Sequence, residues 1–236
     1  GVDWVFLPSV THLPGEKPEH SHTCPYSMSL PFMITASQTG RLLTPVLSLT
    51  DEGVFTEGML ECREALGTSE IRIREAYRTA LAAQRKFDLG LAERGRRLLS
   101  EGGFRYVFAI LGKPYNTYDA FLNLSLFERL RRIGVLAMPP QYLNLDVSEI
   151  GTDLPWLFSA DIFRYTTAVA ARPDIHPVII SNFGCGPDAF TGNQLEPVLT
   201  DKAHLSLEFD EHRGEAGLMT RLEAFLDQLE NCGSKD

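Results

Sequence analysis

The stretch Pro177-Val178-Ile179-Ile180-Ser181-Asn182-Phe183-Gly184-Cys185-Gly186 decides the expected fold. Its first four residues form a short apolar and mostly β-branched run, which is typical of a buried strand. Cys185 follows in the loop at the end of this strand, between two glycines. Ligands of open α/β sheets bind at the carboxyl ends of strands, and glycine lets the backbone approach a ligand closely. The stretch therefore predicts an α/β sheet with a functional loop around Gly184, Cys185 and Gly186.

Strands and helices alternate on both sides of this loop. Apolar runs predict strands at residues 104–111, 135–138, 177–182 and 204–209. Helices are expected between them at 119–132 and 156–171, and a last helix carries Leu218, Leu222, Phe225, Leu226 and Leu229 on one face. Such alternation predicts a parallel sheet with right-handed crossovers.

The first hundred residues predict a second lobe. A strand is expected at 2–7, a loop at 9–26, a short helix at 27–36, an extended segment at 42–49 and a helix at 55–66. A long helix from Ser69 to about Ser100 is expected to connect the lobes, which are residues 1–100 and 101–236. Because a domain rarely opens on a buried strand, we expect the first lobe to be truncated at its N-terminus.

Composition excludes several classes of protein. The 236 residues are 44% hydrophobic and 22% charged, which is ordinary for a soluble globular protein. The net charge is −9 without a basic stripe, so nucleic acid is not an expected partner. No apolar run reaches the ~18 residues of a membrane helix, and no signal peptide is recognised. The four dispersed cysteines form no CxxC pair, so we expect a reducing, cytoplasmic setting without zinc-ribbon or disulfide framework.

Two cysteines lie in loops where their thiols are candidates for a functional role. Cys185 can be a metal ligand, a nucleophile or a plain buried thiol, and His212, at the end of a strand of the same sheet, is its candidate base. Cys24 follows His20 and His22 at alternate positions, which an extended loop would direct to one side. These three side chains are expected either to bind a metal or, for the histidines, to face water.

Other candidates are less specific. The loop Gly112-Lys113-Pro114-Tyr115-Asn116 follows a strand but lacks the spacing of a P-loop, and no G-x-G-x-x-G occurs elsewhere. Lys113 can therefore meet an anionic substrate or belong to a plain turn. Cys62 is expected in the core or on the surface of a helix, and Cys232 in an irrelevant tail.

An acidic cluster follows the last strand at Glu208, Asp210 and Glu211, beside His212. Its members can cap the last helix, orient partners or face water. Arg221 stands among apolar residues and is expected to pair with one of these acids as a structural ion pair.

Five stretches together resemble the uncharacterised domain of large bacterial activase-related proteins, in which it accompanies an ATPase domain like the activator of 2-hydroxyglutaryl-CoA dehydratase. They are residues 1–7 with 24–26, 110–116, 182–188, 208–212 and 216–226. The two C-terminal stretches are also similar to the ends of the dehydratase subunits and of benzoyl-CoA reductase subunits. In that wider family two Rossmann-like lobes clasp a [4Fe-4S] cluster, and an electron from an ATP-driven activator reduces a thioester to a ketyl radical.

The resemblance implies two Rossmann-like lobes here, with Cys24 and Cys185 as candidate cluster ligands and Gly184, Gly186 and Lys113 near the cofactor. A further family cysteine would precede residue 1, so this chain is expected to lack one ligand, and the [4Fe-4S] cluster is expected in the full-length protein. An activator-type ATPase domain and an acyl-CoA are the implied partners. The chain itself lacks the activator's ATPase motifs.

Three functions are thus open. The first is an iron–sulfur component of an acyl-CoA dehydratase or activase-related system, because dispersed thiolates suit a cluster between domains better than zinc. The second is a non-catalytic module that docks the ATPase domain. The third is a cysteine-dependent hydrolase or transferase that uses Cys185 and His212.

Overall fold

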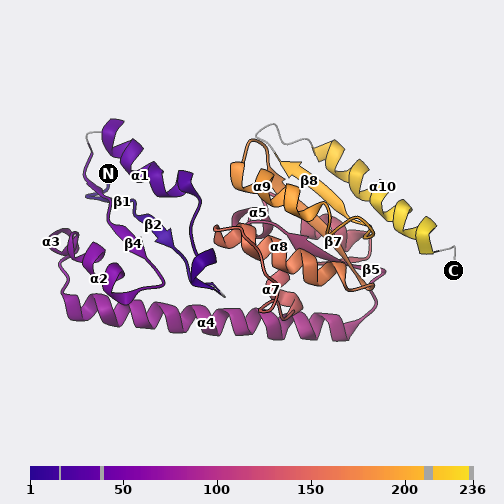
Figure 1. Cartoon of the computed structure of the whole chain (residues 1–236), viewed down its shortest axis with the longest axis horizontal. Helices are drawn as coiled ribbons and strands as arrows, with labels where there is room; N and C mark the ends of the chain where they lie inside the picture. The colour runs from indigo at the N-terminus through magenta and orange to yellow at the C-terminus, as the bar shows by residue number, and fades with distance from the viewer. Residues whose placement is uncertain (16, 38–39, 210–214, 234–236) are drawn as a thin grey trace. The chain divides into compact units, whose positions relative to one another are not determined.

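The computed structural model describes residues 1–15, 17–37, 40–209 and 215–233 (Figure 1). The chain divides into two compact units. The first unit comprises Gly1–Asp88 and Asp153–Leu157, and the second comprises Leu89–Thr152 and Phe158–Asp236. The expected division into domains at residues 100 and 101 stays a prediction.

A four-stranded parallel sheet forms the centre of the second unit. Its strand order is β6-β5-β7-β8, and the strands are β5 (Tyr106–Leu111), β6 (Val135–Met138), β7 (Ile175–Asn182) and β8 (Leu205–Phe209). This topology confirms the predicted α/β class with parallel sheets. The chain leaves β5 to form β6 on one side and returns to form β7 on the other. The strand order therefore reverses between β5 and β7, which is where open α/β sheets bind ligands.

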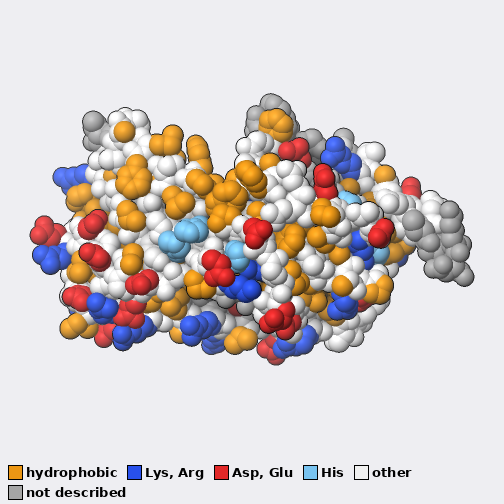
Figure 2. All heavy atoms as spheres, in the orientation of Figure 1, with side chains coloured by type: hydrophobic (Ala, Val, Ile, Leu, Met, Phe, Trp, Pro, Cys, Tyr) orange, Lys and Arg blue, Asp and Glu red, His pale blue; other side chains and the backbone are white. Residues whose placement is uncertain are grey.

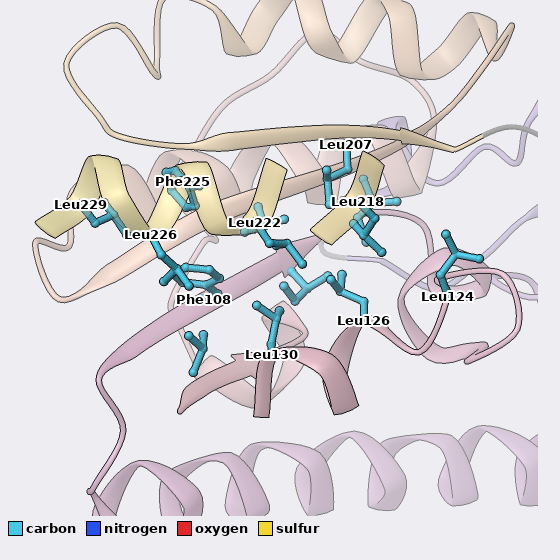
Figure 3. Close-up of a cluster of buried hydrophobic side chains, with 14 residues drawn as sticks. Phe108, Leu124, Leu126, Leu130, Leu207, Leu218, Leu222, Phe225, Leu226 and Leu229 are labelled. Carbon is cyan, nitrogen blue, oxygen red and sulfur yellow. The ribbon is translucent and has the colours of Figure 1, made fainter. Parts of the chain in front are cut away.

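Alternate residues of β5 face two separate cores. Phe108 and Ile110 point into a large cluster with α6 (Leu126–Arg132) and α10 (Glu215–Gly233). Figure 3 shows Leu222 and Leu226 of α10 directed toward Phe108. Ala109 and Leu111 point to the opposite face, against α7 (Pro140–Leu143) and α8 (Leu157–Ala170). A strand buried on both faces reads as a continuous apolar run, as this one does.

The last helix confirms the predicted apolar face. All five of its predicted inward residues are buried in the same cluster: Leu218, Leu222, Phe225, Leu226 and Leu229. Helix α6 ends before Gly134, whose φ of +78° is the left-handed conformation that favours glycine after a helix. Helix α4 (Glu70–Glu101) confirms the predicted long helix and contributes residues to both units. Its side chains Ile73, Tyr77 and Leu91 are buried, whereas Phe87 is exposed.

The first unit contains two small parallel sheets. In one, β1 (Val5–Phe6) pairs with β3 (Leu42–Leu43), and in the other β2 (Ser9–His12) pairs with β4 (Val46–Ser48). The remaining elements are η1 (Pro18–His20), α1 (Pro25–Ser37), α2 (Glu52–Leu60) and α3 (Arg63–Leu66). Asp51 caps α2 by accepting a hydrogen bond from Val54 N at 2.9 Å.

Several predicted boundaries are wrong. Strand β2 lies in the predicted loop 9–26, because Pro8 shifts the chain from one sheet to the other and does not end the extended segment. The helix expected at 119–132 begins only at Leu126, after the short helix α5 (Pro114–Tyr118). The turn expected after Cys185 is the ten-residue helix α9 (Gly186–Leu195). Each error concerns a polar or Pro/Gly-rich segment, whose structure depends on contacts distant in sequence.

Charges on the surface are mixed. Figure 2 shows acidic and basic side chains interspersed on one face of the molecule, without a stripe of one sign. Among the described residues, no helix combines the length and the apolar character needed to cross a bilayer.

Candidate functional site

The candidate site lies where β5 and β7 end side by side. Leu111 of β5 is the register partner of Ile179 of β7. Lys113 follows β5 and precedes α5, whereas Cys185 follows β7 and caps the start of α9. The two predicted residues, 72 positions apart in sequence, are thus brought together at the point where the strand order reverses.

A buried ammonium group is the centre of the site. Lys113 Nζ lies 2.7 Å from Cys185 Sγ and 2.9 Å from Asp188 Oδ1. The Lys113 side chain is only 5% exposed and that of Asp188 only 6%, so their ion pair is shielded from water. Lys113 Nζ also lies 6.0 Å from the centroid of the Tyr115 ring. A buried charge is tolerated only when it is paired in this way.

Asp188 connects three parts of the site. Its Oδ1 binds Lys113, and its Oδ2 accepts a hydrogen bond from the backbone N of Asn182 at 3.0 Å. The side chain of Asn182 in turn donates to Tyr115 Oη at 3.3 Å. Gly184 supports this arrangement with a φ of +71°, a left-handed conformation that turns the chain from β7 into α9. The carboxylate therefore holds both strand ends against the first turn of α9.

The contacts of Lys113 determine its charge state. Burial lowers the pKa of this ammonium, but the hydrogen bonds to Cys185 and Asp188 and the charge of Asp188 outweigh burial, so the pKa is raised above its ordinary value. Burial raises the pKa of Tyr115, although the nearby charge of Lys113 opposes this effect. At neutral pH the site therefore contains a fixed positive charge next to the sulfur.

Cys185 borders an open cavity of about 320 Å³. The cavity is lined by residues of β7, β8 and α9, among them Asn182, Gly186, Asp188 and Glu208. Cys185 itself is partly exposed and lines this cavity. The thiolate form of a cysteine binds metals and attacks electrophiles, and reactive cysteines commonly lie beside a cationic side chain. The arrangement suits either chemistry.

Cys24 and the predicted histidines lie in the first unit, in different surroundings. Cys24 is partly buried directly before α1, and its carbonyl oxygen accepts a hydrogen bond from Met28 N at 3.1 Å. His20 ends η1 and is buried, with Nδ1 2.7 Å from the carbonyl oxygen of Leu154. The expectation that an extended loop directs His20 and His22 to one side is therefore wrong, because His20 belongs to a helical turn.

His12 was not singled out from the sequence, yet its ring packs at a tilt of 45° against that of His22. The ring centroids are 4.4 Å apart, and Nδ1 of His12 lies 2.9 Å from Thr11 Oγ1. Burial and the charge of His22 both lower the pKa of His12. The residue fell in a predicted loop, and only the pairing of β2 with β4 explains its position.

Several other predicted residues lie elsewhere or outside the described part of the chain. Cys62 is buried, and burial raises the pKa of its thiol, which makes it a core residue. Asp210, Glu211 and His212 lie outside the described residues. Arg221 is exposed and forms no ion pair with any residue that the structure describes. Cys232 belongs to α10, but the side chain of Cys232 is not among those that the structure describes.

Asp188 is the member of the site that sequence reasoning missed. It lies inside the stretch 182–188 that contributes to the family resemblance, three residues after Cys185, but no role was assigned to it. An acidic residue in the first turn of a helix that follows a strand can indicate a site residue, because this turn lies at the edge of the sheet. Lys113, which follows the neighbouring strand β5, is the oppositely charged residue that such an acidic residue can pair with.

The described residues do not bring together enough side chains to form a complete metal site. Within them, no group of three or more histidine, cysteine, aspartate or glutamate side chains is arranged to hold a metal ion. Among the described side chains of the second unit, Cys185 is the one thiol at the site. These residues fit one corner of an iron–sulfur cluster and not a complete ligand set, which is normally four.

Comparisons with known proteins identify the family. No curated protein and no solved structure matches the chain. The family model described as CoA enzyme activase uncharacterised domain (DUF2229) matches residues 1–143. The match includes Cys24 and Lys113, whereas Cys185 and Asp188 lie beyond it. Because the match covers more than half of the sequence, this chain belongs to the family of CoA enzyme activase uncharacterised domains.

Proposed function

We propose that this chain supplies Cys185 as one thiolate ligand of an iron–sulfur cluster in a CoA enzyme activase-related system. The observation that supports the proposal is the 2.7 Å contact between Lys113 Nζ and Cys185 Sγ. Cluster ligands are thiolates, and hydrogen bonds to their sulfurs tune the reduction potential of the cluster. Lys113 would provide such a hydrogen bond from a fixed positive charge.

The described residues of the second unit do not complete a ligand set, so the remaining ligands would come from elsewhere. Cys24 of the first unit is the next candidate, and a partner protein or domain would supply the others. When bound, a [4Fe-4S] cluster would supply low-potential electron transfer, in this system to a CoA thioester. The residues of this chain would bind one corner, with Asp188 holding Lys113 in place. An activator-type ATPase domain is the proposed source of the electron.

Anaerobic reconstitution with ferrous iron and sulfide tests this proposal. The iron and acid-labile sulfide content of the chain should fall sharply in Cys185→Ala and in Cys24→Ala. Cys62→Ala is the matched control, because this thiol is buried in the core and should not bind iron. Equal iron content in all four proteins, or none in the unsubstituted chain together with its activase-related partner, would contradict the proposal.

A second candidate function rests on the cavity. Cys185 opens to a space of about 320 Å³ and immediately precedes the N-terminus of α9, whose dipole favours a negative charge. These features also suit a cysteine nucleophile of a hydrolase or transferase.

Alkylation kinetics distinguish the two functions. For a nucleophile, iodoacetamide at neutral pH should modify Cys185 at least about tenfold faster than Cys24, as measured by peptide mass spectrometry. Lys113→Met should slow the modification of Cys185 and leave that of Cys24 unchanged. Equal rates for the two thiols would argue against the nucleophile.

A further inference from the structure

A second cavity of the second unit lies beside the carboxyl end of β6. Its volume is about 410 Å³, within the range of small-molecule sites. The walls are mostly apolar and come from α4, α5, α6, β6 and α7: Leu98, Tyr118, Phe127, Met138 and Tyr142. None of the residues that line this cavity also lines the cavity beside Cys185.

One wall is a loop in an unusual conformation. Leu124 and Ser125, which are consecutive and not glycine, have φ values of +55° and +54°. Left-handed backbone is unfavourable for such residues, and it persists only where the surrounding structure enforces it. Two of them in succession indicate that the shape of this wall is imposed by the fold.

Three side chains hold the loop by hydrogen bonds to backbone groups: Asp119, Asn123 and Arg129. Arg129 Nε donates to the carbonyl oxygen of Leu124 at 2.7 Å, and Asn123 is almost completely buried. Figure 3 shows Leu124 on this loop, with Leu126 and Leu130 on the helix that follows. All three belong to the main core, so the loop is anchored before any ligand arrives.

A positive charge without a partner borders the cavity. Arg94 of α4 is exposed, and among the described residues its guanidinium has no hydrogen bond or ion pair. Glu128 also lines the cavity, but Arg132 neutralises it at 2.6 Å. An uncompensated arginine beside an apolar cavity, in a chain of net charge −9, selects for an anion.

We propose that this cavity binds a small amphipathic anion, with an apolar or aromatic body between Leu98, Phe127 and Tyr142 and one carboxylate or similar group at Arg94. The apolar walls supply affinity for the body, and the guanidinium distinguishes an acid from its neutral analogue. The inference does not depend on the function proposed for Cys185.

Three probes of one shape test the charge preference: 4-phenylbutyrate, 4-phenylbutanol and 4-phenylbutylamine, titrated into the chain and followed by calorimetry or saturation-transfer NMR. The acid should bind about fivefold more tightly than the alcohol, as expected for one partly exposed charge pair, and the ammonium compound most weakly. Arg94→Gln should lower the affinity for the acid to that for the alcohol. Arg96→Gln is the matched control, because Arg96 is also exposed on α4 but does not line the cavity.

A second variant tests the location independently of charge. Ala120 lines the cavity and is exposed, so Ala120→Trp should fill the space without disturbing the core. This variant should lose binding of the acid and the alcohol alike, with an unchanged circular dichroism spectrum. The proposal is overturned if the acid binds no more tightly than the alcohol, if Arg94→Gln and Arg96→Gln act equally, or if a folded Ala120→Trp binds as before.

Discussion

Lys113 and Asp188 form a buried ion pair of 2.9 Å that joins the ends of two neighbouring strands. The lysine follows β5, and the aspartate lies in the first turn of the helix that follows β7. Cys185 receives the second contact of the same ammonium. The position of the thiol is therefore coupled to the integrity of the ion pair, whichever chemistry the thiol performs.

Removing the carboxylate should destabilise the second unit strongly. Asp188→Ala leaves a buried ammonium without its counterion, so we expect a loss of about 3–5 kcal/mol in the free energy of unfolding in urea. Asp174→Ala is the matched control. It breaks the exposed pair with Arg172, in which the closest atoms are 2.7 Å apart, and should cost less than about 1 kcal/mol.

The double variant Lys113→Met with Asp188→Leu completes this test. It removes both charges together, so it should be destabilised less than Asp188→Ala alone. If Asp188→Ala unfolds at the same urea concentration as Asp174→Ala, the pair is not buried as described.

The same ion pair predicts how stability depends on alkaline pH. The folded state raises the pKa of Lys113 above its ordinary value of 10.5, so folding favours the protonated ammonium. The ammonium of Lys113 therefore contributes its full stabilisation below the pKa that this lysine has in the unfolded chain. This stabilisation is lost as the pH rises through the higher pKa of Lys113 in the folded chain. The difference in unfolding free energy between the unsubstituted chain and Lys113→Met should therefore not decline between pH 7 and 9 and should shrink above about pH 10.5. A difference that already declines between pH 7 and 9 would contradict the raised pKa.

The sequence predicts those parts of the fold that depend on local periodicity. Strand β6 lies at the predicted residues 135–138, and the five leucine and phenylalanine positions of α10 are buried as expected. Both elements carry their apolar pattern within a few residues. Strand β2 was missed because Ser9, Thr11 and His12 are polar, and its extended form depends on pairing with β4.

The candidate site was predictable only in part. Lys113 and Cys185 were each singled out because they follow a strand, which is a local property. Their contact depends on β5 lying beside β7, and strand order is set by packing between elements and not by either strand alone. Asp188 was missed for the same reason, since its role appears only once the lysine is placed next to it.

Close approach of β5 and β7 makes Gly112 sensitive to substitution. A Cβ atom at this position would lie 2.9 Å from the carbonyl oxygen of Ile180 and 3.2 Å from its Cβ. Gly112→Ala should therefore push the strand ends apart, cost about 1–3 kcal/mol in urea unfolding and change the alkylation rate of Cys185.

Gly192→Ala is the matched control for this substitution. Gly192 lies within α9, and beyond its chain neighbours and the backbone of its own helix no atom lies within 4 Å of the added Cβ. Alanine favours helix over glycine by about 0.5–1 kcal/mol, so this variant should be neutral or more stable. Equal destabilisation by both substitutions would show that the clash at Gly112 is absent.

His176 predicts a loss of stability in mild acid. Its Nδ1 is buried without a hydrogen-bond partner, and its ring packs edge-on against Tyr106 and Phe108, with centroids 5.7 and 6.1 Å away. Burial lowers the pKa of His176, and the charge of Lys202 lowers it further, although Asp174 opposes both. The unfolded chain therefore binds a proton more readily than the folded one. The contribution of neutral His176 to stability is complete above about pH 6.5 and is lost as pH falls.

Substitution of this histidine should remove the acid dependence that it causes. His176→Phe keeps an aromatic ring in the same contacts but cannot bind a proton, so its unfolding free energy should vary less between pH 7 and 5 than that of the unsubstituted chain. In Lys202→Met the pH dependence of the unfolding free energy should lie between those of the other two proteins, because this variant removes the positive charge that helps to lower the pKa of His176. Urea unfolding at pH 5, 6 and 7 measures all three slopes. If the unfolding free energy of His176→Phe depends on pH as strongly as that of the unsubstituted chain, groups other than His176 cause the acid dependence. A weaker pH dependence in Lys202→Met would then not act through His176.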